Sequence, residues 1–335
     1  LPLAAMALAA VLSAACLALL LRLRAHLPAA HPNERTLHRG AVPRVGGLAL
    51  WAGFLPVALG VGSALPGGYE AWLPPFAALV LVSLADDARG AHVALRLTVH
   101  AGAALWTAVM LWRLPGGGFP GVVAGAPYLL GIAGTALVLA WSADLYNFMD
   151  GNDGLAGATT LIGFTALGLG AAHDPPLRVA ALALAAASAP FLAVNRPPAR
   201  LFLGDVGAVP LGFLAGLFGM GGALRGDWPL WFPLLVFLPF VADATLTLLR
   251  RLVQGERVWQ AHRSHYYQRL HRLGAGHAGT LVTYALLTAG CAVTALACLM
   301  HAPAAGVLAL GAWALALSVL FAGIDYHWRR KPATR

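Results

Sequence analysis

Long apolar stretches separated by short polar segments dominate the chain. About eleven of them are long enough to cross a bilayer, because a spanning helix needs roughly 20 apolar residues. Their predicted limits are 1–21, 46–64, 71–85, 95–112, 126–143, 155–172, 177–194, 206–224, 229–249, 280–300 and 303–324. The pattern predicts an all-α integral membrane protein in which residues 1–335 form a single polytopic membrane domain.

Composition supports this class of protein. Hydrophobic residues make up 59% of the 335 residues and charged residues 10%, which excludes an ordinary soluble domain. The cysteines lie inside apolar stretches and give neither a disulfide framework nor a zinc spacing. The net charge of +9 does not indicate a nucleic acid partner, and we expect none, because basic residues in membrane proteins commonly report orientation.

The distribution of charge predicts the orientation. Of the 22 Arg and Lys residues, 19 lie in alternate loops and the C-terminal tail, so this side is expected to be cytoplasmic and the N-terminus outside. Ten of the 13 carboxylates lie on the same predicted side. Acids and bases on one face suggest an active site that handles a metal and phosphates there.

Two acidic motifs lie beside predicted helices. In SLADDARG, Asp86 and Asp87 end the third predicted span, and the repulsion between adjacent carboxylates favours a nearby proton or cation. A solvated helix end is the alternative. If NFMDGNDGL starts the sixth helix, Asp150 and Asp153 lie three residues apart on one side of it. A cap and turn rich in Asn and Asp is the alternative there.

A third motif, FLGDVG, brings Asp205 to the start of the eighth predicted span. A lone carboxylate of this kind binds magnesium while phosphates complete the coordination shell. A helix cap is the alternative. Asn195 and Arg200 lie in the preceding loop, where they could meet a base or a phosphate.

The longest predicted cytoplasmic loop covers residues 250–279. Its basic and apolar residues alternate, so part of it is expected to lie in the membrane interface as an amphipathic helix. Attraction to headgroups does not by itself explain the cluster His262, Arg263 and His265, because Arg already supplies that charge. A zinc site is the less favoured alternative, since no further well-spaced ligand accompanies the histidines.

In this order, the motifs resemble those of the polyprenyl-phosphate N-acetylhexosamine-1-phosphate transferases, the MraY- and WecA-like membrane enzymes. The resemblance runs from HPNERTLHRGAVPRVGG at 31 to HRSHYYQRL at 262. Its first and last motifs are closest to the WbpL-like branch that initiates O-antigen synthesis. The resemblance implies an enzyme of the bacterial inner membrane that transfers a sugar-1-phosphate from a UDP-N-acetylhexosamine to undecaprenyl phosphate and releases UMP.

The resemblance also implies roles for individual residues. Asp86 matches the acid proposed to deprotonate the lipid phosphate, with Asp87 beside it. Asp205 matches the principal ligand of Mg²⁺, with Asp150 as a second metal residue and Mn²⁺ as a candidate substitute. The positions that match binding residues for the nucleotide, metal or sugar diphosphate are Asn147, Asp150, Asp153, Asn195, His262, Arg263 and His265. A homodimer is compatible with this interpretation.

Several alternatives stay open at this stage. The donor sugar could be N-acetylglucosamine, N-acetylfucosamine or N-acetylquinovosamine, and departures such as Asp144, where relatives usually have Asn, bear on that choice. A transporter or lipid flippase is the main rival, although its inverted repeat is not visible. The spacing of CDP-alcohol phosphotransferases is absent, and the retained acids argue against a non-catalytic scaffold.

Overall fold

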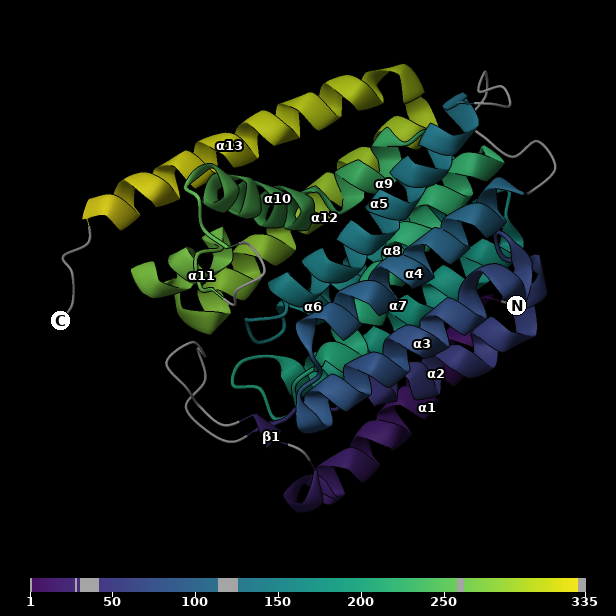
Figure 1. The fold of residues 1–335 in the computed structure, drawn as a ribbon, viewed down its shortest axis with the longest axis horizontal. Coiled ribbons are helices and arrows are strands. Elements are labelled where there is room, and N and C mark those ends of the chain that lie inside the picture. Colours follow the sequence, from purple (N-terminus) through teal and green to yellow (C-terminus); the bar gives the residue numbers. More distant parts are fainter. Residues whose placement is uncertain (1, 28, 31–41, 114–125, 258–261, 331–335) are drawn as a thin grey trace.

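The protein is an all-α integral membrane protein, described by a computed structural model at residues 2–27, 29–30, 42–113, 126–257 and 262–330 (Figure 1). Within these ranges nine helices are long and apolar enough to cross a membrane, and α6 is a shorter apolar helix. The first eight helices are α1 (Pro2–Arg22), α2 (Gly47–Val61), α3 (Gly68–Arg89), α4 (Val93–Trp112), α5 (Ala126–Met149), α6 (Leu155–Gly170), α7 (Pro175–Asn195) and α8 (Asp205–Arg225).

The C-terminal part contains α9 (Trp231–Val236), α10 (Leu238–Val253), α11 (Tyr266–Leu270), α12 (Gly276–His301) and α13 (Gly306–Arg330). Short 3₁₀ turns cover Arg24–His26, Gly62–Ala64 and Pro303–Ala305, and a π turn, His271–Ala275, joins α11 to α12. The strand pairing in the described residues is one antiparallel contact between β1 (Ala29–Ala30) and β2 (Val42–Pro43).

Helix α8 is the centre of the bundle. Every residue from 206 to 223 is buried, and α3 and α5 pack along it. Small residues recur through this helix, which lets neighbouring backbones approach closely in a membrane, where burial of apolar surface gives no driving force between helices. The first residue of this fully enclosed helix is Asp205, so the core of the fold fixes the position of that carboxylate.

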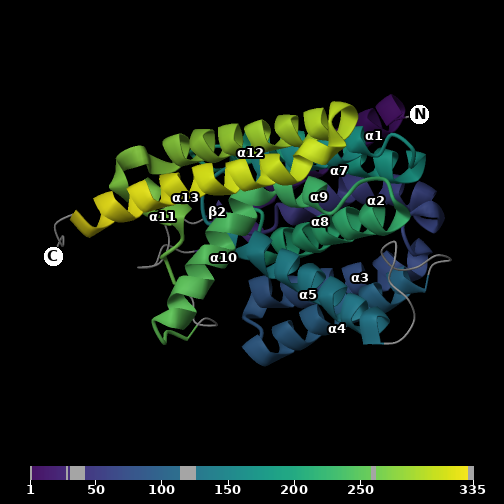
Figure 2. The same cartoon turned by 90° about the horizontal axis from the view of Figure 1, so that it is seen from above.

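The ninth expected span, 229–249, is not one helix. It divides at Phe237 into the six-residue α9 and the longer α10. Pro239 supplies no backbone N–H and disfavours the helical conformation in the residue before it, so the helix is interrupted there. Helix α10 then crosses α12 and α13 at a steep angle and carries its charged end away from the main bundle (Figures 1 and 2).

One local expectation also needs correction. Helix α6 begins at Leu155, so Asp150 and Asp153 lie in the α5–α6 loop and not on one helical face. Buried apolar residues continue α5 to Met149, and Gly154 then adopts a left-handed φ of 79° directly before α6. The segment 250–279, expected to be a loop that is partly an amphipathic helix, contains the end of α10 at Val253, α11 from Tyr266 and the start of α12 at Gly276.

Candidate active site

The end of α3 meets the start of α8. Asp87 Oδ2 accepts the backbone N–H of Val206 at 2.9 Å, and Asp87 Oδ1 lies 3.9 Å from Arg44 Nε. Gly204 precedes Asp205 with a φ of 74°, and a Cβ on it would lie 2.2 Å from the Arg44 carbonyl oxygen. A helix N-terminus favours negative charge, so this junction suits anionic groups.

Arg96 on α4 links two carboxylates from different helices. Its Nη1 donates to Asp86 Oδ2 at 2.6 Å and lies 3.8 Å from Asp205 Oδ2. The other Asp86 oxygen accepts the N–H of Ala91 at 2.6 Å. Asn147 Nδ2 approaches Asp205 Oδ2 at 3.5 Å, at the outer limit of a hydrogen bond. Helices α3, α4, α5 and α8 therefore converge on Asp205.

Asp150 adds a further carboxylate to this cluster. It is half-buried in the α5–α6 loop, and burial raises its pKa well above the usual value for an aspartate. The neighbouring charge of Asp205 raises the pKa further, Arg44 opposes the shift, and Asp87 and Asp153 add to it. Negative charge thus exceeds the nearby positive charge around Asp150, an arrangement that favours a proton or a bound cation.

Asp153 and Asn195 hold the surrounding loops together. Asp153 Oδ2 accepts the N–H of Ala199 at 2.9 Å, and Asp153 N–H donates to His277 Nδ1 at 3.3 Å. Asn195 is buried, accepts the N–H of Gly154 at 2.9 Å and donates to the carbonyl of Leu201 at 2.8 Å. Since these contacts use both polar atoms of the Asn195 amide, its observed role is to fix the α5–α6 and α7–α8 loops.

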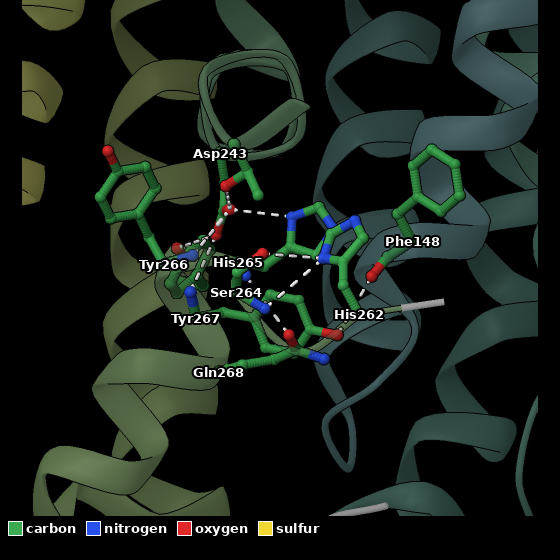
Figure 3. A network of polar contacts seen from close by, with 10 residues as sticks. Phe148, Asp243, His262, Ser264, His265, Tyr266, Tyr267 and Gln268 are labelled. Atoms are coloured by element: carbon green, nitrogen blue, oxygen red, sulfur yellow. Dashed lines mark hydrogen bonds and ion pairs between the residues drawn. The ribbon is translucent and has the colours of Figure 1, made fainter. Parts of the chain in front are cut away.

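The histidine motif is built around a buried acid, Asp243 of α10 (Figure 3). Asp243 accepts the backbone N–H groups of Tyr266 and Tyr267, each at 2.9 Å, and the hydroxyl of Tyr284. His265 Nδ1 lies 3.2 Å from Asp243 Oδ1, and only 2% of the His265 surface is exposed. The carboxylate thus caps the first turn of α11 and fixes the His265 ring.

His262 and Arg263 lie nearer the surface. The His262 ring stacks on His265 at a centroid distance of 4.8 Å, and its Nδ1 is 2.9 Å from Ser264 Oγ. Burial, followed by the charges of His265 and Arg251, lowers the pKa of His262 to about 3. His262 is therefore neutral at physiological pH and can contact a ligand only as a hydrogen-bonding group, whereas Arg263 is exposed and cationic.

Tyr267 connects the histidine motif to the acidic cluster. Its hydroxyl donates to the backbone carbonyl of Phe148 at 3.0 Å, two residues before Asp150. Among the described residues, neither His262 nor His265 forms a hydrogen bond or ion pair with Asp86, Asp87 or Asp205. The structure brings the predicted acids together and joins the histidines to them through Tyr267 and the α5–α6 loop.

Four residues of the site were not among the predicted functional residues. Arg44 and Arg96 balance the carboxylates, His277 contacts Asp153, and Asp243 organises α11. Asp243 carried a recognisable signal, because a lone acid in an apolar stretch usually has a role or a partner. The other three residues gave no such signal in the sequence, and only the packing of the helices brings them to the site.

Comparisons with known proteins identify the group to which the chain is related. The sequence profile of glycosyl transferase family 4 matches residues 71–223. A phospho-N-acetylmuramoyl-pentapeptide-transferase of Synechococcus sp. (strain JA-3-3Ab) is 32% identical over an alignment of 263 positions that covers 69% of this chain and 72% of the relative.

Two further relatives are named for N-acetylglucosaminyl 1-phosphate transfer. A probable undecaprenyl-phosphate N-acetylglucosaminyl 1-phosphate transferase of Bacillus subtilis is 23% identical over 73% of this chain and 70% of its own length. The undecaprenyl-phosphate alpha-N-acetylglucosaminyl 1-phosphate transferase of Escherichia coli K12 is 26% identical over 72% of this chain and 69% of its own length. The identity to the cyanobacterial enzyme, over more than two thirds of both proteins, shows that this chain belongs to glycosyl transferase family 4.

Proposed function

We propose that the protein transfers an N-acetylhexosamine-1-phosphate from a UDP-sugar to undecaprenyl phosphate and releases UMP. The observation that carries the proposal is the convergence of acids from three segments, α3, the α5–α6 loop and α8, with Arg44 and Arg96 as the neighbouring cations. The acids are Asp87, Asp150, Asp153 and Asp205. The names of the relatives agree with this class of reaction.

A magnesium ion fits the acidic cluster. Within the described part of the chain, no three His, Cys, Asp or Glu side chains could hold a metal unaided. Magnesium, however, is commonly bound by one or two carboxylates together with substrate phosphates and water. Asp205 and Asp150 would hold it. Their negative charges repel each other and burial disfavours the charged form of Asp150, so a bound cation would relieve both effects. When bound, the ion would screen the repulsion between the two anionic substrates and stabilise charge on the departing phosphate.

The chain's own residues would position the substrates. An oxygen of the lipid phosphate forms a bond to the sugar-bearing phosphorus, while the bond from that phosphorus to the UMP oxygen breaks. Asp86 would hold the proton of the lipid phosphate if it enters protonated, and Arg96 fixes the orientation of Asp86 through a 2.6 Å contact. The junction of Asp87 with the N-terminus of α8 would orient phosphate oxygens, which helix N-termini favour.

The histidine motif would contact the sugar diphosphate. Arg263 is exposed and can pair with a phosphate, whereas neutral His262 can donate or accept a hydrogen bond. His265 is already held by Asp243, so it would shape this surface by fixing the position of the neighbouring His262 ring. Holding both substrates in one orientation removes much of the entropic barrier to their reaction.

The orientation and the biological branch belong to the same proposal. The concentration of basic residues supports a cytoplasmic active face, an external N-terminus and location in a bacterial inner membrane. The WbpL-like form of the first and last motifs supports the first lipid-linked step of an O-antigen or similar surface polysaccharide. The residues of the first motif up to Ala41 lie outside the described residues. N-acetylglucosamine, N-acetylfucosamine and N-acetylquinovosamine are the proposed donors to compare.

The test is release of UMP by purified protein from a panel of UDP-sugars, with and without undecaprenyl phosphate and with and without Mg²⁺. Release that requires both the lipid and the metal is the expected result, and the best donor identifies the sugar. Absence of release with every donor, from protein that elutes as a folded species in detergent, would overturn the proposal. In that case lipid transport by the same protein in vesicles becomes the activity to measure.

A further inference from the structure

A groove separates the C-terminal half of α13 from α11 and the π turn that follows it. It encloses about 680 Å³. Leu320, Gly323 and Ile324 line it from α13, and Leu270 and Leu273 line it from the opposite side. Helices α11 and α13 contact each other, and Figure 2 shows them side by side. The groove has apolar walls, and none of its lining residues belongs to the candidate active site.

The same groove becomes cationic towards the end of α13. His327 and Arg330 complete its lining, and they follow Leu320 and Gly323 on one helical face at intervals of three or four residues. At 1.5 Å per residue, the apolar part and the cationic end are about 15 Å apart or less along the helix. An apolar wall with a cationic end matches an amphiphile that has an anionic head.

Aromatic residues mark the level of the cationic end in the membrane. Tyr326 is 53% exposed, and the guanidinium carbon of Arg330 lies 4.4 Å from the centre of its ring. Trp328 lies one residue beyond His327. Tyr and Trp are enriched at the headgroup level of bilayers, so Arg330 and His327 are positioned where lipid phosphates lie.

Arg330, at this end of the groove, has no carboxylate partner among the described residues, whereas Arg250 and Arg269 have one. Arg250 and Arg269 both pair with Asp325, the former at 2.9 Å. Across residues 2–330, where the structure describes them, no carboxylate forms an ion pair with Arg330 or His327. A lipid phosphate would supply the missing negative charge, because anionic headgroups attract basic residues at the membrane surface.

We infer that this groove is a binding site for an anionic phospholipid, with an acyl chain along Leu320 and Ile324 and the phosphate at Arg330 and His327. We assign the groove to a membrane phospholipid and not to the acceptor lipid, because its lining contains none of the carboxylates of α3, the α5–α6 loop and α8 at which the acceptor phosphate would react. A bound lipid would fasten α13 to α11, the helix whose Tyr267 contacts the loop of Asp150.

The test is native mass spectrometry of the full chain in detergent, titrated with phosphatidylglycerol or with phosphatidylcholine of the same acyl chains. We expect tighter binding of phosphatidylglycerol. Arg330→Gln should weaken it about fivefold, the factor typical of one cation near an anionic surface. Gly323→Leu should also weaken it by filling the groove, because a Cβ at Gly323 meets no atom within 4 Å and the variant is expected to fold. Arg329→Gln, on the same helix but outside the lining, is the matched control.

Three results would overturn the inference: equal binding of the two phospholipids, unchanged binding by both groove variants, or stronger displacement of phosphatidylglycerol by undecaprenyl phosphate than by excess phosphatidylglycerol. The last result would assign the groove to the acceptor lipid. Inorganic phosphate tests the contribution of the lipid headgroup alone. It is expected to compete poorly with phosphatidylglycerol, because it has no acyl chain to occupy the apolar part of the groove. Since the readout is lipid binding, its outcome is independent of whether the protein releases UMP.

Discussion

Tyr267 donates its phenolic hydrogen to the backbone carbonyl of Phe148 across 3.0 Å, and this contact joins α11 to the end of α5. The two residues are 119 positions apart in the chain. On one side of the contact lies the capped first turn of α11, where Asp243 holds His265, and on the other lies the loop with Asp150. This hydrogen bond, together with the stacking of the Phe148 and His265 rings at a centroid distance of 6.1 Å, therefore helps to set the relative position of the histidine motif and the acidic cluster.

Tyr267→Phe should keep the fold and slow transfer. The variant loses one buried hydrogen bond, which contributes about 0.5–1.5 kcal/mol to stability. We expect kcat/KM for the UDP-sugar to fall about tenfold, because small displacements of positioned groups are costly in catalysis. Tyr69→Phe is the matched control, since the Tyr69 hydroxyl also donates to a backbone carbonyl, that of Leu59 in α2. Tyr69 lies in the first turn of α3, at the end of that helix far from Asp86 and Asp87. Equal losses in the two variants would contradict the positioning role.

Asp205→Asn should abolish magnesium-dependent transfer in protein that remains folded in detergent. The amide keeps the shape of the side chain but removes the charge that would bind the ion, and we expect a loss of about a hundredfold or more in kcat. UMP release across a range of Mg²⁺ concentrations measures the effect. Asp227→Asn makes the same chemical change between α8 and α9 and should leave transfer intact. Turnover near that of the wild type in Asp205→Asn would refute the assignment of the metal.

Asp243→Ala should destabilise the protein strongly. The substitution leaves His265, two backbone N–H groups and the Tyr284 hydroxyl without their acceptor in a fully buried position. Loss of one partner from such a network costs about 3–5 kcal/mol. Thermal unfolding in detergent should show the loss, and Asp243→Asn, which retains one acceptor oxygen, should be intermediate. A melting temperature unchanged by Asp243→Ala would show that water replaces the carboxylate.

The apolar pattern was sufficient to predict most of the helices, because a membrane-spanning helix can be recognised from the length of its apolar stretch. It could not show that the ninth stretch would divide at Phe237, because other helices of this bundle contain Pro without ending there, as at Pro190 of α7 and Pro210 of α8. Spacing also misled at Asp150 and Asp153. A separation of three residues suggests one helical face, but the helix begins only at Leu155.

The acids of the site were predictable from their motifs, whereas their partners were not. Asp87 caps α8 through Val206, and Arg96 reaches both Asp86 and Asp205, contacts between residues 119, 10 and 109 positions apart. Such pairs are set by helix packing, which cannot be predicted from the local sequence. The same holds for His277, whose proximity to Asp153 depends on how α12 packs against α6.

A last prediction concerns pH and the end of the bundle opposite the acidic cluster. Asp227 lies in the loop before α9, where burial raises the pKa of its carboxyl to about 6, with a further contribution from Asp174 that Arg225 opposes. Its buried Oδ2 has no hydrogen-bond partner among the described residues. Folding therefore favours the protonated acid, so this contribution to stability is present below about pH 4, the usual pKa of an unfolded aspartate, and is lost as the pH rises through about 6.

Asp227→Asn mimics the protonated acid at every pH. Its melting temperature should exceed that of the wild type above about pH 6, and the difference should shrink as the pH falls towards 4, because the wild-type carboxyl then takes up its proton. Thermal unfolding in detergent across this range measures the difference. Glu70→Gln removes an exposed carboxylate from the first turn of α3 and should show no such trend. A difference between Asp227→Asn and the wild type that is constant with pH would mean that the amide acts through packing and not through the proton.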